Sequence, residues 1–220
     1  MAKYLIHAYP KRMWYVENYL IPSMLKQGIS AKDIRVYNDE KHLGNLKACM
    51  EAFASCTAEF GGTWHLQDDV CISKDFKQKT ETYNAGIVCG FSSLKFDGDI
   101  EEKKGFVSRE KAYFSFPCIR IPNEWARECA EYVNTQIIGN PEYEEFWKDG
   151  VNDDWAFRKY LAECHTDCEV LNLVPCIVDH IDFLIGGGSN GQQRQYPIRA
   201  QYWEDDDVIE ELKKCLNNGG

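Results

Sequence analysis

The sequence predicts an α/β fold, namely a mostly parallel sheet in one domain, with helices on both faces and a small antiparallel excursion. Three observations support this prediction. Strand-like apolar segments alternate with helical segments over about the first 70 residues, and such alternation is typical of parallel sheets with right-handed crossovers. The chain has 220 residues, 44% of them hydrophobic, which is enough for one sizeable core. Polar residues follow the predicted strand ends, where open α/β sheets bind ligands.

The first half of the sheet is predicted from the spacing of its apolar residues. Residues at helical spacing share one face in the segment that begins at Asn45. Pro22 marks a kink or a restart in the preceding helical segment. The predicted strands are 5–8, 33–37, 63–66 and 86–90, and the helices between them are 13–25, 45–60 and 73–82.

The second half is less regular. A charged stretch at 95–110, interrupted by glycines, is predicted to be a surface loop or hairpin. The remaining elements are helices that begin near 123 and 152, late strands at 170–174 and 176–179, a glycine-rich loop at 186–191 and an acidic helix at 205–216.

Composition narrows the classes of function and the cellular environments that we expect for this chain. The formal net charge is -10, which argues against passive adhesion to nucleic acid. No apolar run approaches the roughly 18 residues of a membrane span, so we expect a cytoplasmic protein with no membrane and no obligate protein partner. The ten cysteines are scattered singly, which indicates reduced thiols. A zinc site built on Cys164, Cys168 and Cys176 is an alternative, but its spacing fits no standard finger.

Two glycine motifs fail in context. Gly186, Gly188 and Gly191 have the spacing of a dinucleotide fingerprint, but that motif must follow the first strand of a βαβ unit. Ser189 has the spacing of a nucleophile elbow, yet no histidine follows it in the sequence. We reject both interpretations.

Three polar clusters interrupt apolar segments: Gln67-Asp68-Asp69, Asn152-Asp153-Asp154 and Asp179-His180. Each has an ordinary structural explanation. The first can form a turn, the second can stabilise the positive end of a helix dipole, and the histidine can be a hydrogen-bonded core residue. The combination of the three is what points to a ligand site.

In this combination the chain resembles GT-A type glycosyltransferases, whose fold is Rossmann-like. The segment Leu66-Gln67-Asp68-Asp69-Val70 is similar to their acidic DxD motif, although Gln67 stands where many relatives have an acid. The resemblance implies that Asp69 is the metal ligand and that Asp68 contacts the ribose or the donor sugar. The segment from Val174 to His180 is similar to the late segment whose histidine completes the metal site, and the loop with Ser189 then closes over the diphosphate.

The resemblance also implies how the chain is divided. Residues 1–90 form the nucleotide-sugar half, 91–203 the acceptor half and 204–220 a C-terminal helix or tail. The metal is Mn²⁺ or Mg²⁺, since carboxylate and imidazole ligands suit these ions. Lys47 is equally well explained as a solvated helix residue. The further donor-binding residues implied by the resemblance are His7, Ala8, Tyr9, Asn38, Asp39, Asn45 and Lys47.

The expected activity is transfer of a sugar from a nucleotide diphosphate, a UDP-sugar above all, to a hydroxyl acceptor. Asp154, rather than Asp153, is the expected catalytic base, which implies inversion at the anomeric carbon. The acceptor is either a saccharide or, as in small phage-like enzymes that the chain resembles, a hydroxymethylated pyrimidine in DNA. An alternative from another class is a catalytically inactive nucleotide- or carbohydrate-binding module with the same fold.

Overall fold

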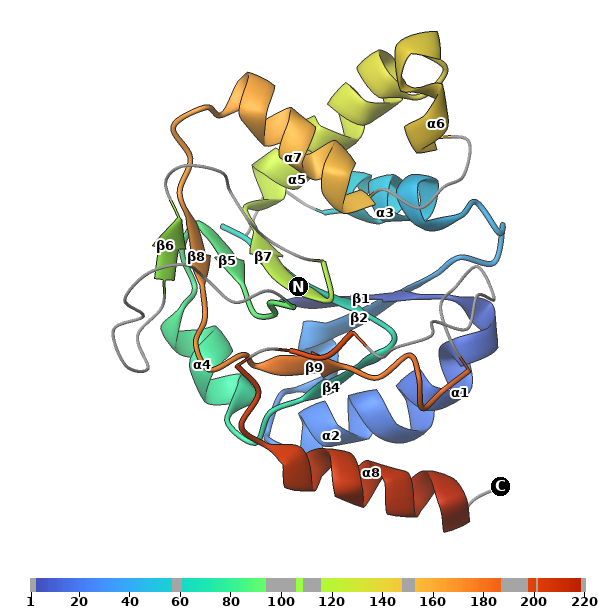
Figure 1. The fold of residues 1–220 in the computed structure, drawn as a ribbon, viewed down its shortest axis with the longest axis vertical. Coiled ribbons are helices and arrows are strands. Elements are labelled where there is room, and N and C mark those ends of the chain that lie inside the picture. The colour runs from blue at the N-terminus through green and yellow to red at the C-terminus, as the bar shows by residue number, and fades with distance from the viewer. Residues whose placement is uncertain are drawn as a thin grey trace.

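A mixed sheet of seven strands runs through the middle of the described part of the chain, in the order β2-β1-β3-β7-β5-β8-β6 (Figure 1). The computed structural model describes residues 3–56, 61–93, 106–108, 116–147, 153–186, 198–200 and 202–218. Within these residues the sheet separates two layers of helices. The predicted α/β class, with helices on both faces, is confirmed.

The N-terminal part of the sheet is parallel. Strand β1 (Tyr4–Ala8) lies between β2 (Ile34–Asn38) and β3 (Thr63–Gln67) and pairs in parallel with both. These strands match the first three predicted from the sequence. Their carboxyl ends therefore meet at one edge of the sheet, which is where the polar residues after β1, β2 and β3 gather.

The remaining strands differ in direction. Strand β7 (Cys118–Ile121) is antiparallel to both β3 and β5 (Ile87–Cys89), and β8 (Val170–Asn172) is parallel to β5. Strand β6 (Phe106–Ser108) forms an edge antiparallel to β8. Five of the seven strands thus point the same way, as expected for a mostly parallel sheet. The charged excursion contributes β6, and the rest of it lies outside the described residues.

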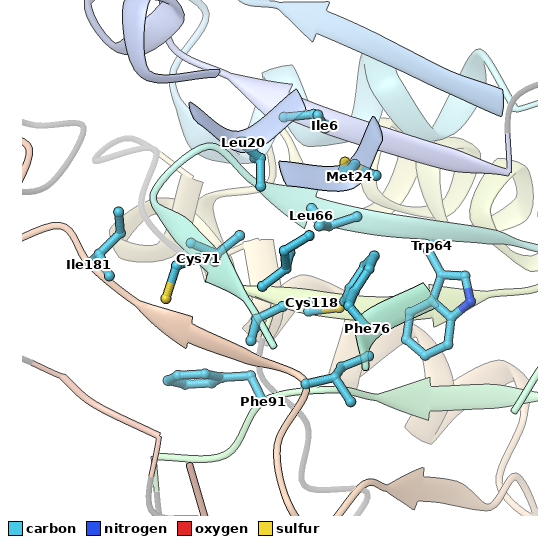
Figure 2. Close-up of a cluster of buried hydrophobic side chains, with 14 of the residues drawn as sticks. Ile6, Leu20, Met24, Trp64, Leu66, Cys71, Phe76, Phe91, Cys118 and Ile181 are labelled. Carbon is cyan, nitrogen blue, oxygen red and sulfur yellow. The ribbon is translucent and has the colours of Figure 1, made fainter. Parts of the chain in front are cut away.

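One face of the sheet is covered by the helical N-terminal segment together with α4 (Phe76–Thr82) and α8 (Asp206–Asn218). Alternate residues of the strands, such as Ile6 and Leu66, point into this layer, where they meet Leu20, Met24 and Phe76 (Figure 2). The expected acidic C-terminal helix is therefore present, and it packs on the core through Ile209 and Leu212.

The N-terminal helical segment is continuous but irregular. A 3₁₀ turn at Pro10–Arg12 leads into α1 (Met13–Tyr15), a π-helical turn at Val16–Leu20 and α2 (Ile21–Lys26). Pro22 lies in the first turn of α2, directly after the π-helical turn, and its ring and missing N–H are incompatible with regular α-helical bonding to the preceding turn. The predicted kink or restart at this proline is thus a widened turn directly before it.

The opposite face carries α3 (Asn45–Ala54), α5 (Asn123–Tyr132) and α7 (Asp153–Cys164) (Figure 1). Their buried residues pack with Leu5 and Ile119 of the sheet. A π-helical turn at Val133–Ile137 extends α5, and a 3₁₀ turn at Pro141–Tyr143 precedes α6 (Glu144–Trp147). The helix near 73 begins later than predicted, because Ser73 bonds to Asp75 in a turn and α4 starts at Phe76.

A second, two-stranded sheet lies beside the main one. Strand β4 (Val70–Ile72) pairs antiparallel with β9 (Val178–His180), and the register places Val70 opposite His180. This ribbon is buried against the first helical layer. The two late strands predicted side by side in the sequence therefore belong to different sheets. Within the described residues, no helix is both long and apolar enough to cross a membrane.

Candidate active site

Polar side chains gather where β1 and β3 end and where the small sheet begins. Asp68 and Asp69 form the turn that joins β3 to β4. Because β4 pairs with β9, this turn lies next to His180, and the N–H of Ile181 donates to the carbonyl oxygen of Asp69 at 2.8 Å. The structure thus brings together two of the three polar clusters that were singled out in the sequence.

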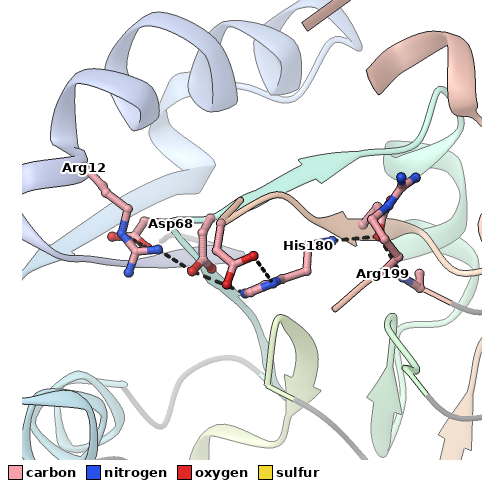
Figure 3. Close-up of polar contacts among 8 residues, drawn as sticks. Arg12, Asp68, His180 and Arg199 are labelled. Atoms are coloured by element: carbon pink, nitrogen blue, oxygen red, sulfur yellow. Dashed lines mark hydrogen bonds and ion pairs between the residues drawn. The ribbon is translucent and has the colours of Figure 1, made fainter. Parts of the chain in front are cut away.

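Arg12 binds both carboxylates of the turn (Figure 3). Its Nε lies 3.3 Å from Asp68 Oδ1, and its Nη1 donates a short hydrogen bond to Asp69 Oδ2. The backbone N–H of Tyr9 donates to Asp68 Oδ2 at 2.5 Å. Both oxygens of Asp68 are therefore engaged by the protein itself, which fixes the orientation of this carboxylate.

His180 lies on the other side of Asp69. Its Nε2 is 3.3 Å from Asp69 Oδ2, and its Nδ1 is 3.3 Å from Asp182 Oδ1. Arg12, Asp68, Asp69, His180 and Asp182 are all at least nine-tenths buried. They form one network of charged side chains, with Asp69 in its middle.

Burial and neighbouring charges oppose each other in this network. Burial by itself lowers the pKa of His180, but the negative charges of Asp69 and Asp182 outweigh it and raise that pKa to about 9. Burial likewise raises the pKa of Asp69, yet His180 and Arg12 overcome this and hold it below its ordinary value. Burial and the charge of Asp69 raise the pKa of Asp68 to about 7. Asp69 is therefore the ionised carboxylate of the pair.

Asp69 also has binding capacity left over. Its Oδ1 is buried and accepts no hydrogen bond from any described residue. Such an atom is costly unless a ligand or ion satisfies it. Asp69 and His180 supply one carboxylate and one imidazole nitrogen, a donor set that suits Mn²⁺ or Mg²⁺ when substrate phosphates complete the coordination. Because the pKa of His180 is raised to about 9, its ring must lose a proton when Nε2 binds the ion. In the described residues, no group of three or more His, Cys, Asp or Glu side chains is arranged to hold a metal ion. Asp69 and His180 would hold such an ion only where a bound ligand supplies its remaining oxygen atoms.

Asp153 and Asp154 begin α7 on the other helical layer. Burial and the charge of Asp154 raise the pKa of Asp153 to about 7, and the charge of Asp69 contributes in the same direction. Asp153 is thus near enough to Asp69 for an electrostatic interaction. Asp153 Oδ1 accepts a hydrogen bond from the N–H of Asp154 at 3.1 Å. Asp154 accepts one from the N–H of Trp155 at 2.8 Å and lies 4.0 Å from Arg158.

Of the predicted donor-binding residues at the end of β1, Tyr9 contacts this network directly and His7 does not. Tyr9 holds Asp68 through its backbone, and Ala8 accepts a hydrogen bond from the N–H of Asp39 through its carbonyl oxygen. His7 points to the other face of the sheet, where its Nε2 lies 2.9 Å from Nδ1 of His65. Burial lowers the pKa of His7 to about 4, so this pair is neutral near pH 7.

The predicted residues after β2 support a loop. Asp39 accepts hydrogen bonds from the N–H groups of Leu43 and Gly44, at 2.9 and 3.2 Å, so its carboxylate orders the chain before α3. Asn38 ends β2 and keeps its Oδ1 buried with no hydrogen bond from the described residues. Asp39 therefore has a structural role here, and any contact that it makes to a ligand stays a prediction.

For the other predicted donor-binding residues that the structure describes, it gives a position in the fold but no described contact with the charged network. Asn45 is the first residue of α3, and Lys47 in the same turn is exposed. Gln67 is the last residue of β3, where it pairs with His7 in the strand register. Ser189 lies outside the described residues. The roles assigned to these four residues stay predictions.

Sequence patterns did not reveal Arg12 and Asp182. Arg12 follows Pro10 in a short turn, where nothing in the local pattern distinguishes it from Lys11 beside it. Asp182 comes two residues after His180, and this proximity was the only available signal. Both acquire their role through tertiary contacts with the turn after β3.

The alternative zinc site is not assembled. Cys176 is buried in the first hydrophobic layer, whereas Cys168 packs against the second layer on the opposite face of the sheet. All ten cysteines are free thiols, which agrees with the expected absence of a disulfide framework.

Comparisons with known proteins give only distant structural likenesses. No protein-family model and no curated protein matches the chain. The inositol-1-phosphate CTP transferase from T. maritima is 11% identical, with a TM-score of 0.49 over 100% of this chain and 97% of the other. A putative glucose-1-phosphate thymidylyltransferase from Bacillus anthracis is 11% identical, with a TM-score of 0.42 over 82% and 89%.

HddC from Yersinia pseudotuberculosis is 12% identical, with a TM-score of 0.33 over 58% of this chain and 80% of the other. Two of these three structures are thus named as nucleotide-transferring enzymes. All three TM-scores are below 0.5, so the function is argued below from the geometry of the chain itself.

Proposed function

We propose that this chain is a metal-dependent glycosyltransferase that moves a sugar from a nucleotide diphosphate, a UDP-sugar in the first instance, to a hydroxyl acceptor. One observation carries the proposal. Asp69 and His180, far apart in the sequence, approach each other to 3.3 Å at the carboxyl ends of parallel strands. The remaining oxygen of Asp69 is buried and accepts no hydrogen bond from the described residues, as expected of a site that receives a ligand.

The chemistry needs positive charge where the sugar leaves the diphosphate. The transition state is oxocarbenium-like, and negative charge grows on the leaving group. Mn²⁺ or Mg²⁺, held by Asp69 and His180, supplies Lewis-acid neutralisation of that charge when it is bound. Arg12 adds a permanent positive charge beside the same carboxylates, and its planar fork suits phosphate oxygens.

The acceptor hydroxyl needs a base. A carboxylate serves best when its pKa lies near the working pH, and Asp153 has a pKa of about 7 because of burial and the charge of Asp154. We therefore propose Asp153 as the base, in place of Asp154, which the sequence alone favoured. Each of the two acids accepts one backbone hydrogen bond at the start of α7, and Asp154 also lies 4.0 Å from Arg158.

The test combines binding with turnover. Thermal unfolding of the purified protein is measured with UDP-sugars, each with and without Mn²⁺, and the release of free sugar is assayed in parallel. We expect stabilisation that requires both metal and donor, together with slow release of sugar. Stabilisation without any transfer or hydrolysis would instead identify an inactive binding module.

Asp69→Ala is the decisive variant. Because it removes the ionised carboxylate between Arg12 and His180, we expect it to abolish the metal-dependent part of the donor stabilisation. Asp207→Ala is the control, since Asp207 is exposed and pairs with Lys74 on the surface. An unchanged metal-dependent shift in Asp69→Ala would refute the site. Glycosylation of hydroxymethylated DNA is assayed beside saccharide acceptors, and transfer to saccharides alone excludes the DNA acceptor.

A further inference from the structure

We infer that Arg12 is a built-in cation that competes with the divalent metal ion for Asp69 and turns to the diphosphate when the donor binds. The metal ion then binds tightly only together with the donor. This inference rests on the proposed function and adds an order of binding to it. It follows from which atoms of Arg12 contact which atoms of the two aspartates.

Arg12 and the ion would compete for the charge of one carboxylate group, that of Asp69. Asp69 Oδ2 accepts a hydrogen bond from Arg12 Nη1, and the same oxygen is the one that lies 3.3 Å from His180 Nε2 (Figure 3). An ion bound by both Asp69 and His180 must share this carboxylate with the guanidinium. Arg12 is only 6% exposed, so water screens the repulsion between the two cations poorly.

Arg12 cannot relieve that repulsion by losing a proton. A guanidinium stays protonated in proteins, and the neighbouring Asp69 and Asp68 raise the pKa of Arg12 further, despite the opposing effect of burial. The guanidinium must therefore either move away from Asp69 or gain an anion that neutralises both cations. A diphosphate supplies such an anion, and arginine binds phosphate oxygens through two parallel hydrogen bonds.

The structure also offers Arg12 a fixed point from which to move. Its Nε lies 3.3 Å from Asp68 Oδ1 in an ion pair that lacks hydrogen-bond geometry, while Asp68 Oδ2 is held by the N–H of Tyr9 at 2.5 Å. The Nη1 group can thus leave Asp69 while Nε keeps its partner. The two aspartates then have different roles. Asp68 keeps its ion pair with Arg12, whereas Asp69 exchanges its contact with Arg12 for one with the ion.

A static ion pair gives the opposite prediction. If Arg12 only neutralises and orients the aspartates, its removal disorders Asp69 and weakens metal binding. If Arg12 competes with the ion, its removal strengthens metal binding in the absence of donor. The sign of the change in metal affinity therefore distinguishes the two roles.

The experiment is a titration of the full chain with Mn²⁺ alone, followed by calorimetry or by the electron paramagnetic resonance of free Mn²⁺. For Arg12→Gln we expect metal affinity to rise by about tenfold, within the usual range of coupling between two sites. Arg12→Lys keeps the charge, so its affinity stays close to that of the wild type. Arg199→Gln is the matched control, because Arg199 pairs with buried Asp179 and makes no contact with Asp69 among the interactions described. We expect its Mn²⁺ affinity to be unchanged.

Equal or weaker Mn²⁺ binding by a folded Arg12→Gln would overturn the inference. Circular dichroism establishes whether the variant folds. If it does not, the wild type provides a second measurement, the ¹⁵Nε signal of the Arg12 side chain in nuclear magnetic resonance. This signal should change with Mg²⁺ and UDP together and stay in place with Mg²⁺ alone. A signal that UDP with Mg²⁺ leaves unchanged would also overturn the inference.

The two proposals fail in different ways. If UDP does not raise the Mn²⁺ affinity of the wild type, the proposed function fails, whatever Arg12→Gln does to metal binding. If UDP raises it but Arg12→Gln binds Mn²⁺ no better than the wild type, the donor site stands and only the role of Arg12 is wrong. Binding of Mn²⁺ by UDP in buffer is measured separately and subtracted.

Discussion

Two buried aspartates, Asp69 in the turn before β4 and Asp179 in β9, each lie beside an arginine, yet their surroundings differ. Asp179 Oδ1 accepts hydrogen bonds from the N–H groups of His180 and Ala200 at 2.9 and 2.7 Å, and its Oδ2 accepts one from Arg199. Asp69 shares one oxygen between Arg12 and His180, and its other oxygen accepts no hydrogen bond from the described residues. Figure 3 shows the two arginines on either side of His180.

The difference separates a structural carboxylate from one that can receive a ligand. Both oxygens of Asp179 accept hydrogen bonds from described residues, so this residue holds the segment around Ala200 against β9. Asp69 is also buried, but its Oδ1 accepts no hydrogen bond from the described residues. A buried acid with an unsatisfied atom therefore indicates function better than burial or an arginine partner does.

The largest expected effect extends the comparison to a third buried acid, Asp153 at the start of α7. Asp153→Asn should lower the transfer rate by about 10²- to 10⁴-fold, as for the loss of a general base. In the wild type the rate should rise with pH through about 7, because the base works unprotonated and its pKa is raised to about 7. The variant should lack this rise. Asp154→Asn is the control, and if it abolishes the rate while Asp153→Asn does not, the assignment is reversed.

The same pKa shift predicts a stability effect with a defined sign. The folded protein raises the pKa of Asp153 from 3.8 to about 7, so folding favours the protonated form. This contribution is fully present below pH 4 and is lost as the pH rises to about 7. Asp153→Asn should therefore gain stability relative to the wild type between these pH values, as urea unfolding would show.

Next in size is the loss of the structural carboxylate. Asp179→Ala should lower the free energy of unfolding by about 2–5 kcal/mol, since it leaves buried N–H groups and Arg199 without their partner. Asp207→Ala, which breaks the exposed pair with Lys74, should leave the urea midpoint unchanged because exposed ion pairs contribute little. Equal midpoints for the two variants would remove the distinction drawn between Asp69 and Asp179.

The smallest effect concerns the residue behind the histidine. Asp182 forms an ion pair with His180, with Oδ1 3.3 Å from Nδ1, and we propose that this carboxylate orients the ring so that Nε2 can bind the proposed ion. Asp182→Asn should therefore weaken Mn²⁺ binding in the presence of UDP by about 10- to 100-fold, as for other groups that orient a metal ligand. Unchanged affinity in a folded variant would show that His180 needs no such support.

Sequence patterns were informative where the signal is local. The first three strands and α3 follow from apolar spacing, and the turn after β3 followed from two carboxylates at a strand end. Strand direction was not accessible in this way, because the antiparallel course of β7 depends on the chain that leads into it. The assignment of β8 and β9 to different sheets also depends on their distant partners rather than on their own residues.

The site likewise combines features that the sequence predicted with features that depend on tertiary contacts. The meeting of Asp69 with His180 was predicted from a family resemblance, and the structure places them together. Arg12 could not be predicted, since its role arises from the fold of the turn at Pro10–Arg12 against the turn after β3. The choice between Asp153 and Asp154 also depends on tertiary surroundings, because adjacent acids at a helix start are equivalent in the sequence.

The pairing of β4 with β9 has a consequence for how the protein folds. It joins two short segments that are far apart in the chain, Val70–Ile72 and Val178–His180, and His180 faces Asp69 only in the register that sets Val70 opposite it. Closing so long a loop costs conformational entropy that only three residue pairs of this ribbon repay directly. We therefore expect the contact between Asp69 and His180 to form late, during synthesis as well as during refolding. A newly made chain should form most of its main sheet before this proposed site is complete.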